Sequence, residues 1–339
     1  MADTGKVDPA FFERYLYPRL GADRDDVALG PTAGVDFGVV DVGGDALVTA
    51  TDPFSVLPGL GLAAAGRFGA HICLSDVAVS GVAPSHLAVS FALPTETTDE
   101  EFAALWAAVD EVCSALGVAV VTGHTARYPD AKYPWVGSAT VFGVGDHDDV
   151  VRPDGARPGD RIVVTKGPAV ETTGLLTTLY PDAEAFEDLS AETLAVARDR
   201  LAEVRLTRDA LALTEAAPVT AMHDATEGGL RNALVEMAAA AGVRFAVERA
   251  AVPVQPGVEP VCDALGIDPW AATTAGTFVA AVAPEGVDDA LAALSDRGTP
   301  AAAVGRVREG DGVVVDGDRV TAPDTDASWA AYDRLGDSD

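Results

Sequence analysis

The stretch "AMHDATEGGLRNALVEMAAAAG", residues 221–242, joins an apolar segment to a helical one through an acid, a threonine and two glycines. The segment that ends at Asp224 reads as a strand, and the spacing that follows predicts a helix. Two interpretations of the junction remain open. The acid suits a simple helix cap, whereas a carboxylate beside Thr226 and the bare backbone of Gly228 and Gly229 suits a phosphate and metal site.

Strand-like and helix-like segments follow one another along the chain, which predicts an α/β fold containing hairpins. The Pro- and Gly-rich stretch "DVVRPDGARPGDRIVVT" separates two strand-rich halves, so we expect two domains, residues 1–150 and 151–330. Strands are expected at residues 37–42, 46–52, 85–93, 117–123, 135–145, 160–165, 218–224, 243–248, 277–283, 301–307 and 312–317. Helices are expected at residues 11–20, 60–81, 99–116, 189–216, 228–241, 258–265 and 287–297, and after Gly174.

The composition is strongly acidic: 53 Asp and Glu against 23 Lys and Arg give a formal net charge of -30. Such a chain repels a phosphate backbone, so we expect no nucleic-acid partner. With 48% hydrophobic residues, disorder does not explain the acidity. A salt-rich cytosol explains the acidity, because high ionic strength screens the repulsion between the negative charges. We therefore expect a halophilic archaeon as the source.

The cysteines Cys73, Cys113 and Cys262 are scattered and form no zinc or redox motif, which favours reduced thiols in the cytoplasm. The N-terminal stretch "MADTGKVDPAFFERYLYPRL" has no apolar core of the kind an export signal requires. Arg67 interrupts the longest stretch of small apolar residues. We therefore expect a cytoplasmic protein without a membrane span.

Four acids recur just after or between the expected strands: Asp36, Asp52, Asp76 and Asp224. Each is flanked by Gly, Ser, Thr or Pro, which places it at an element end, where side chains reach a cleft. Taken singly, each can be a helix cap or a turn acid. Together, carboxylates from several element ends can hold magnesium ions over a nucleotide triphosphate.

The order of the motifs carries a resemblance. "TDPFS", "SDVAVSGVAPSHLAVSFALP", "VVTGHT", "RIVVTKG" and "HDATEGGLRNALVEMA" occur in sequence between residues 34 and 306. Together they resemble the aminoimidazole ribonucleotide synthetase-like (PurM-like) ATP-binding superfamily. Within it, "DATEGGL" is most similar to the branch of the hydrogenase-maturation carbamoyl dehydratase, whereas the Ser-Asp and "FALP" motifs are shared with thiamine-monophosphate kinase.

The resemblance implies a two-domain PurM-like fold. Its N-terminal α/β domain would pair across a homodimer into a β-barrel, with ATP and Mg²⁺ near the interface, and its C-terminal domain would cover the nucleotide. The implied metal ligands are Asp36, Asp52, Asp76 and Asp224, and the implied catalytic residues are Asp52, Asp224 and His124. The implied contacts to the nucleotide come from Thr51, Asp76, Thr226, Gly228, Gly229 and Lys166.

Lys166 is one of only three lysines and would place a positive charge near phosphates, although a solvated strand end explains it equally well. His124 stands in "GHT", where the superfamily usually has Gly-Asp-Thr. Imidazole is a poorer magnesium ligand than carboxylate. The site would then bind fewer ions, take a softer metal or have lost activity, or His124 would only support the structure.

The other departure is at the end of the chain, which reads "AAYDRLGDSD" and carries no cysteine for a carbamoyl group. We therefore do not expect dehydration of a thiocarboxamide on the chain's own tail. The function expected is ATP-dependent activation of an amide or phosphate oxygen of a small substrate. The alternatives are a kinase similar to thiamine-monophosphate kinase and a non-catalytic ATP-binding assembly or regulatory factor.

Overall fold

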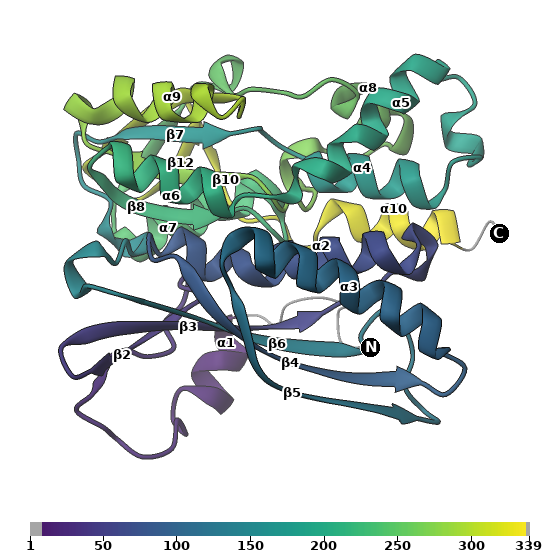
Figure 1. Ribbon diagram of the computed structural model, residues 1–339. Helices are drawn as coiled ribbons and strands as arrows, with labels where there is room; N and C mark the ends of the chain where they lie inside the picture. The colour runs from purple at the N-terminus through teal and green to yellow at the C-terminus, as the bar shows by residue number, and fades with distance from the viewer. Residues whose placement is uncertain (1–8, 337–339) are drawn as a thin grey trace.

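The computed structural model describes residues 9–336, which fold around two β-sheets (Figure 1). The first sheet has the strand order β1-β2-β3-β6-β4-β5, and the second has the order β13-β12-β9-β11-β7-β10-β8. Because the first six strands form one sheet and the others form the second, the fold has the two α/β parts that were predicted. Residues 1–8 and 337–339, the outermost parts of the two terminal stretches considered for an export signal and a terminal cysteine, lie outside the described residues.

The first sheet is mostly antiparallel, with a parallel pairing between β4 and β5. Ala46, Val48 and Ala50 of β3 are buried, and the residues between them point to the opposite face. One face of the sheet therefore carries the core, and the other is open to solvent. The strands are β1 (Val27–Leu29), β2 (Gly38–Val42), β3 (Asp45–Phe54), β4 (Pro84–Pro94), β5 (Ala119–Tyr128) and β6 (Gly137–Gly145).

Two helices, α2 (Leu62–Val79) and α3 (Asp99–Leu116), cover the buried face of the first sheet (Figure 1). Thr98 and Glu101 form a reciprocal capping box that begins α3, and left-handed Gly117 ends it. The helices approach closely at Gly66, where a Cβ atom would lie 2.5 Å from the carbonyl oxygen of Leu105. Glycine at this position therefore allows the tight packing of α2 on α3.

The second sheet is covered on both faces at its strand β10. All five residues of β10 are buried: Val279 and Ala281 face α7, whereas Phe278, Ala280 and Val282 face α6 and α9. The strands are β7 (Arg161–Thr165), β8 (Val219–Asp224), β9 (Arg244–Val247), β10 (Phe278–Val282), β11 (Ala301–Arg308), β12 (Gly312–Val315) and β13 (Asp318–Val320). The helices are α4 (Val170–Leu179), α5 (Ala191–Asp199), α6 (Thr207–Ala216), α7 (Gly229–Ala241), α8 (Val258–Leu265), α9 (Val287–Asp296) and α10 (Ala327–Gly336).

Helix α2 lies between the two parts of the fold. It packs on the first sheet and on α3, and it also contacts α6 and β8 of the second part. By length and composition α2 alone, among the described helices, is apolar enough to cross a membrane. Because 67% of that segment is buried inside the protein, its apolar character is that of a core helix.

Most expected elements are present, and two expectations were wrong. The helix expected after Gly174 begins earlier, at Val170, and Gly174 lies inside it. The single helix expected over residues 189–216 is broken into α5, the 3₁₀ helix η6 (Arg200–Val204) and α6. The N-terminal helix is a short α1 (Pro9–Phe11) followed by a π-helix, η1 (Phe12–Leu16). Strands β1 and β13 and helix α10 were not expected.

Candidate functional site

Four acids from separate elements meet between the two parts of the fold. Asp36 precedes β2, Asp52 lies on β3, Asp76 on α2 and Asp224 at the end of β8. Asp76 and Asp224 are only 8% and 2% exposed. Burial raises the pKa of Asp76 well above its usual range, and the nearby charges of Asp52, Asp224 and Asp36 and a hydrogen bond with the Asp52 carboxyl raise it further. The structure therefore brings together the acids that sequence analysis selected.

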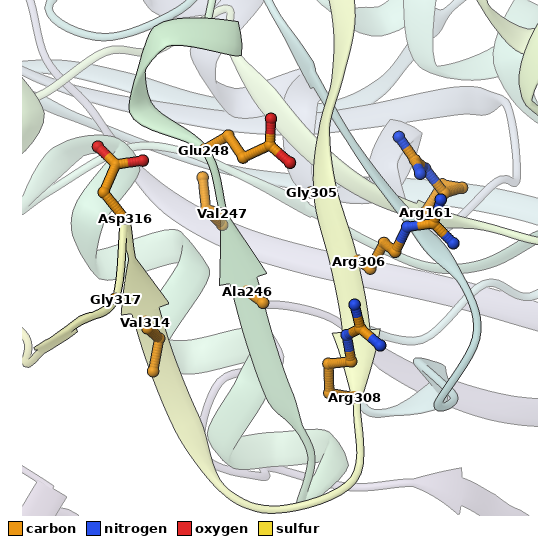
Figure 2. Close-up of a pocket in the computed structure, with 10 residues that line it drawn as sticks. All are labelled: Arg161, Ala246, Val247, Glu248, Gly305, Arg306, Arg308, Val314, Asp316 and Gly317. Atoms are coloured by element: carbon orange, nitrogen blue, oxygen red, sulfur yellow. The ribbon is translucent and has the colours of Figure 1, made fainter.

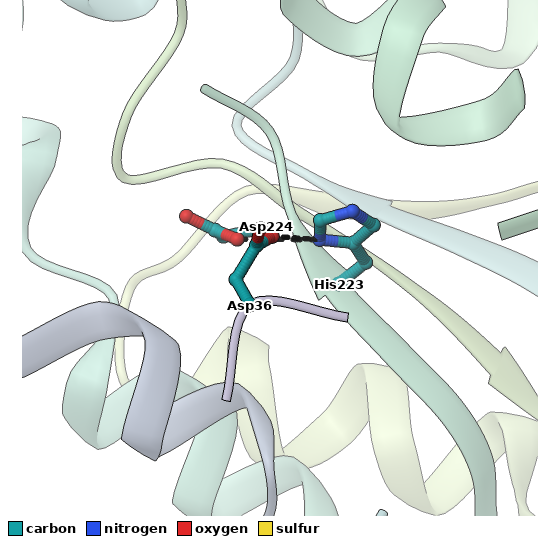
Figure 3. A group of neighbouring side chains, drawn as sticks. All are labelled: Asp36, His223 and Asp224. Atoms are coloured by element: carbon teal, nitrogen blue, oxygen red, sulfur yellow. Dashed lines mark hydrogen bonds and ion pairs between the residues drawn. The ribbon is translucent and has the colours of Figure 1, made fainter. Parts of the chain in front are cut away.

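His223, which sequence analysis did not select, lies within this cluster (Figure 3). Its Nδ1 atom is 3.3 Å from Asp224 Oδ1 and 3.7 Å from Asp36 Oδ2, and its Nε2 atom is 3.2 Å from Glu236 Oε2. Burial opposes a charge on the ring, but the hydrogen bonds to Asp224 and Glu236 and the charge of Asp36 outweigh it and raise the pKa of His223 to about 10. The imidazolium therefore offsets part of the negative charge.

The cluster is suited to a cation. Side-chain atoms of Asp36, His223 and Asp224 lie within 4.8 Å of one another. Because the His223 imidazolium has no free lone pair, the ligands in this group are the carboxylate oxygens of Asp36 and Asp224. Asp52 and Asp76 add carboxylate oxygens beside them. Hard oxygen donors are the ligands that Mg²⁺ prefers, and Mg²⁺ usually shares its shell with substrate phosphates. Buried carboxylates this close together repel one another until a cation joins them.

The two glycines after Asp224 have a different role from the one expected. Both have left-handed backbone angles, and the Gly228 N–H donates to Asp326 Oδ2 at 2.6 Å, while the Gly229 N–H donates to the Thr226 carbonyl at 2.9 Å. Asp326, which comes from the segment before α10, is therefore the anion at the start of α7. The expectation that these two amides lie free for a phosphate does not fit this arrangement.

Lys166 is also engaged within the protein. It is 4% exposed, and its Nζ atom donates to the carbonyl oxygens of Glu203 at 2.9 Å and Arg205 at 2.6 Å. A third partner, Asp209 Oδ2, lies at 3.3 Å. All three ammonium hydrogens thus have protein acceptors, so the lysine joins β7 to the η6–α6 connection instead of facing a phosphate.

Thr51 and His124 lie on the open face of the first sheet, away from Asp52. Thr51 Oγ1 is 2.9 Å from Thr140 Oγ1 across the β3–β6 pairing. His124 is in register with Ser90, which alternates with buried residues of β4, and its Nε2 atom is 3.5 Å from Tyr128 Oη. Because neighbouring residues of a strand point to opposite faces, Thr51 and Asp52 are separated by the sheet itself.

Glu171 is another buried acid, one that sequence analysis did not select. Its Oε2 atom accepts hydrogen bonds from Thr273 Oγ1 and the Ala275 N–H, both at 2.9 Å. Burial raises its pKa from 4.5 to about 7; these hydrogen bonds lower it less, and the charges of Asp326 and Glu227 add to the rise. The acidic region therefore extends from the four acids along the start of α7.

This raised pKa predicts a pH dependence of stability. Because the folded-state value lies above the unfolded one, the protonated form stabilises the fold below pH 4.5, and this stability is lost as the pH rises through about 7. The loss is on the order of 3 kcal/mol. In Glu171→Gln this decline should be absent from urea-unfolding free energies. Glu192→Gln, at an exposed position, serves as the control. If the free energies of unfolding of wild type and Glu171→Gln change with pH in parallel, the raised pKa of Glu171 is refuted.

Comparison with known proteins gives matches over most of the chain. Residues 34–145 match the family model "AIR synthase related protein, N-terminal domain", and residues 157–318 match "AIR synthase related protein, C-terminal domain". A carbamoyl dehydratase HypE of Rhizobium leguminosarum bv. viciae is 30% identical over 300 residues, covering 84% of this chain and 79% of that protein. The Escherichia coli K12 carbamoyl dehydratase HypE is 28% identical over 320 residues, covering 91% of this chain and 88% of that protein.

Comparison with solved structures also gives proteins with a similar fold. The crystal structure of E. coli HypE, a hydrogenase maturation protein, has a TM-score of 0.69 at 25% identity, covering 93% of this chain and 95% of that one. The structure described as AaThiL complexed with AMPPCP and TMP has a TM-score of 0.71 at 21% identity, covering 88% and 92%. These matches confirm the predicted two-domain architecture.

Proposed function

Because the chain belongs to the AIR synthase related family of ATP-dependent enzymes, we propose that it activates an amide or phosphate oxygen of a small substrate by transfer of the γ-phosphoryl group of ATP. The observation that supports this proposal is the convergence of Asp36, Asp52, Asp76 and Asp224. Phosphoryl transfer requires positioned cations and charge neutralisation more than covalent chemistry from the protein.

The cluster supplies these requirements from its own residues. Asp36, Asp52, Asp76 and Asp224 would hold Mg²⁺, which neutralises charge on the polyphosphate. The His223 imidazolium orients Asp224 and Asp36 and keeps their repulsion in check. Asp52 and Asp224 are the residues that we place nearest the transferred group.

The test is turnover by the full-length chain. Purified protein is incubated with Mg²⁺, ATP and separate panels of carboxamide-bearing and phosphorylated acceptors, and the products are identified by mass spectrometry. ADP formation that depends on a carboxamide or phosphorylated acceptor, without release of a stable phosphorylated product, supports the proposal. Phosphorylation of thiamine monophosphate would instead make the chain a small-metabolite kinase, and ATP binding without turnover on any acceptor would make it a non-catalytic factor.

We also propose that the chain is a homodimer that pairs through the open face of its first sheet. That face carries exposed Val144, together with Thr51 and His124, which would then lie in the interface. Val144 is 53% exposed, and Val121 and Tyr128 of β5 in the same sheet are 54% and 47% exposed. Several exposed apolar side chains on one sheet are typical of an interaction surface. Val144→Asp should therefore convert the dimer to monomer in sedimentation equilibrium while the circular dichroism spectrum stays unchanged. A wild-type monomer would contradict the proposal.

A salt-rich cytoplasm is the environment we propose for a net charge of -30. The free energy of unfolding should then increase as KCl is raised from about 0.1 M to about 2 M, because salt shortens the range of the repulsion. Urea unfolding at fixed pH measures this increase. A free energy that falls or stays level over the same range would leave the acidity without this explanation.

A further inference from the structure

Arginines cluster on one face of the second sheet, beside a cavity over β9, β11 and β12 (Figure 2). Arg161 of β7 is directly opposite Arg306 of β11, and Arg308 of β11 is directly opposite Arg244 of β9. Cross-strand partners share a face, so the four guanidinium groups rise on the same side. Like charges placed opposite one another destabilise a sheet unless an anion lies between them.

Three of these arginines have no acidic partner among residues 9–336. Arg244 lies near Asp311 and helps to lower the pKa of that carboxyl, after the larger effect of Arg319. Arg161, Arg306 and Arg308 form no ion pair with any residue of the described part of the chain. The chain has 53 acidic and 23 basic residues, so three neighbouring arginines that form no ion pair are an unusual feature of its surface.

The surface is hollowed. A cavity of about 220 Å³ is floored by Ala246, Gly305 and Val314 and has the three arginines at one end. Glu248 and Asp316 line its other end, and Figure 2 shows their carboxylates across the strands from the guanidinium groups. The cavity is smaller than the roughly 300 Å³ at which sites for drug-sized molecules begin, so it suits a compact ligand.

We propose that this cavity binds a small phosphorylated metabolite that also carries hydroxyl groups. Guanidinium forks bind phosphate oxygens in bidentate fashion, and the two carboxylates at the far end accept hydrogen bonds from hydroxyl groups. The small volume of the cavity and the net charge of -30 disfavour a polyanionic macromolecule. The four-acid cluster takes no part, so the site stands or falls independently of the proposed reaction.

The test measures binding of inorganic phosphate and of ribose 5-phosphate to the full-length protein by isothermal titration calorimetry. EDTA is present so that no divalent cation can hold phosphate at the four-acid cluster, and KCl is kept at the lowest concentration at which circular dichroism shows a folded protein. Wild type should bind both probes saturably. Loss of charge-assisted hydrogen bonds in Arg161→Gln/Arg306→Gln should weaken both by roughly tenfold or more.

Arg319→Gln is the matched control, because that arginine is exposed and already pairs with Asp311. It should bind both probes as wild type does. Glu248→Gln should weaken ribose 5-phosphate several-fold more than inorganic phosphate. The proposal is overturned if wild type shows no saturable binding, if the double variant binds like wild type, if Arg319→Gln loses as much affinity as the double variant, or if Glu248→Gln leaves the ratio of the two affinities unchanged.

Discussion

Asp52→Asn is expected to abolish magnesium-dependent ATP binding while leaving the fold intact. Asparagine keeps the shape of the side chain but removes the charge that Asp52 brings to buried Asp76. Removal of one charged group from a buried, hydrogen-bonded pair costs about 2–5 kcal/mol, so the affinity for Mg²⁺ and ATP should fall by roughly 100-fold or more. Without the metal, the variant should unfold at the same urea concentration as wild type or a higher one, because one repulsive charge is gone.

Calorimetric titration with ATP in the presence and absence of Mg²⁺ measures this effect. Asp45→Asn, on the same strand but exposed and outside the cluster, is the matched control and should bind like wild type. Unchanged nucleotide affinity in a folded Asp52→Asn protein would show that the four acids do not form the ATP site. Loss of affinity in Asp45→Asn would show that only the overall charge matters.

Lys166→Met is expected to lower the free energy of unfolding by about 3 kcal/mol or more. Methionine fills most of the same volume, but it leaves the carbonyls of Glu203 and Arg205 without their donor and Asp209 with only Arg297 as a charged partner. The folded fraction should still bind Mg²⁺ and ATP with wild-type affinity, because the lysine does not reach the four acids.

Urea unfolding and calorimetry on the same samples separate the two roles of Lys166. Lys132→Met, which changes an exposed lysine, controls for the loss of one positive charge. If Lys166→Met retains its stability and loses nucleotide binding, the expectation from sequence was right and the lysine contacts phosphate after all.

The order of helices and strands was predictable because hydrophobic periodicity and local caps specify it. The helix from Asp99 to Leu116 begins at a capping box and ends at a glycine, and both signals are local. The break between α5 and α6 was not predictable, because residues 200–206 contain neither glycine nor proline. There the carbonyls of Glu203 and Arg205 turn to the ammonium of Lys166, a contact that only the tertiary structure supplies.

The candidate site was predictable only in part, for a similar reason. The four acids stood out beside Gly, Ser, Thr or Pro, and the order of the motifs along the chain carried the resemblance. The expectation of element ends does not hold for Asp52 and Asp76, which lie within β3 and α2. No local sequence pattern shows that the ring of His223, next to Asp224, lies in the cluster, or that Asp326 accepts a hydrogen bond from the Gly228 N–H. Both contacts depend on segments distant in sequence.

Three of the four clustered acids come from the first part of the fold, and Asp224 comes from the second. In a chimaera that exchanged one half of the chain for that of a relative, the clustered acids would therefore come from two different proteins. Its activity would depend on whether the contacts of α2 with the second part of the fold held Asp224 close enough to the other three acids. Recombination between such proteins must therefore preserve the contact surface between the two parts, and not only each part by itself.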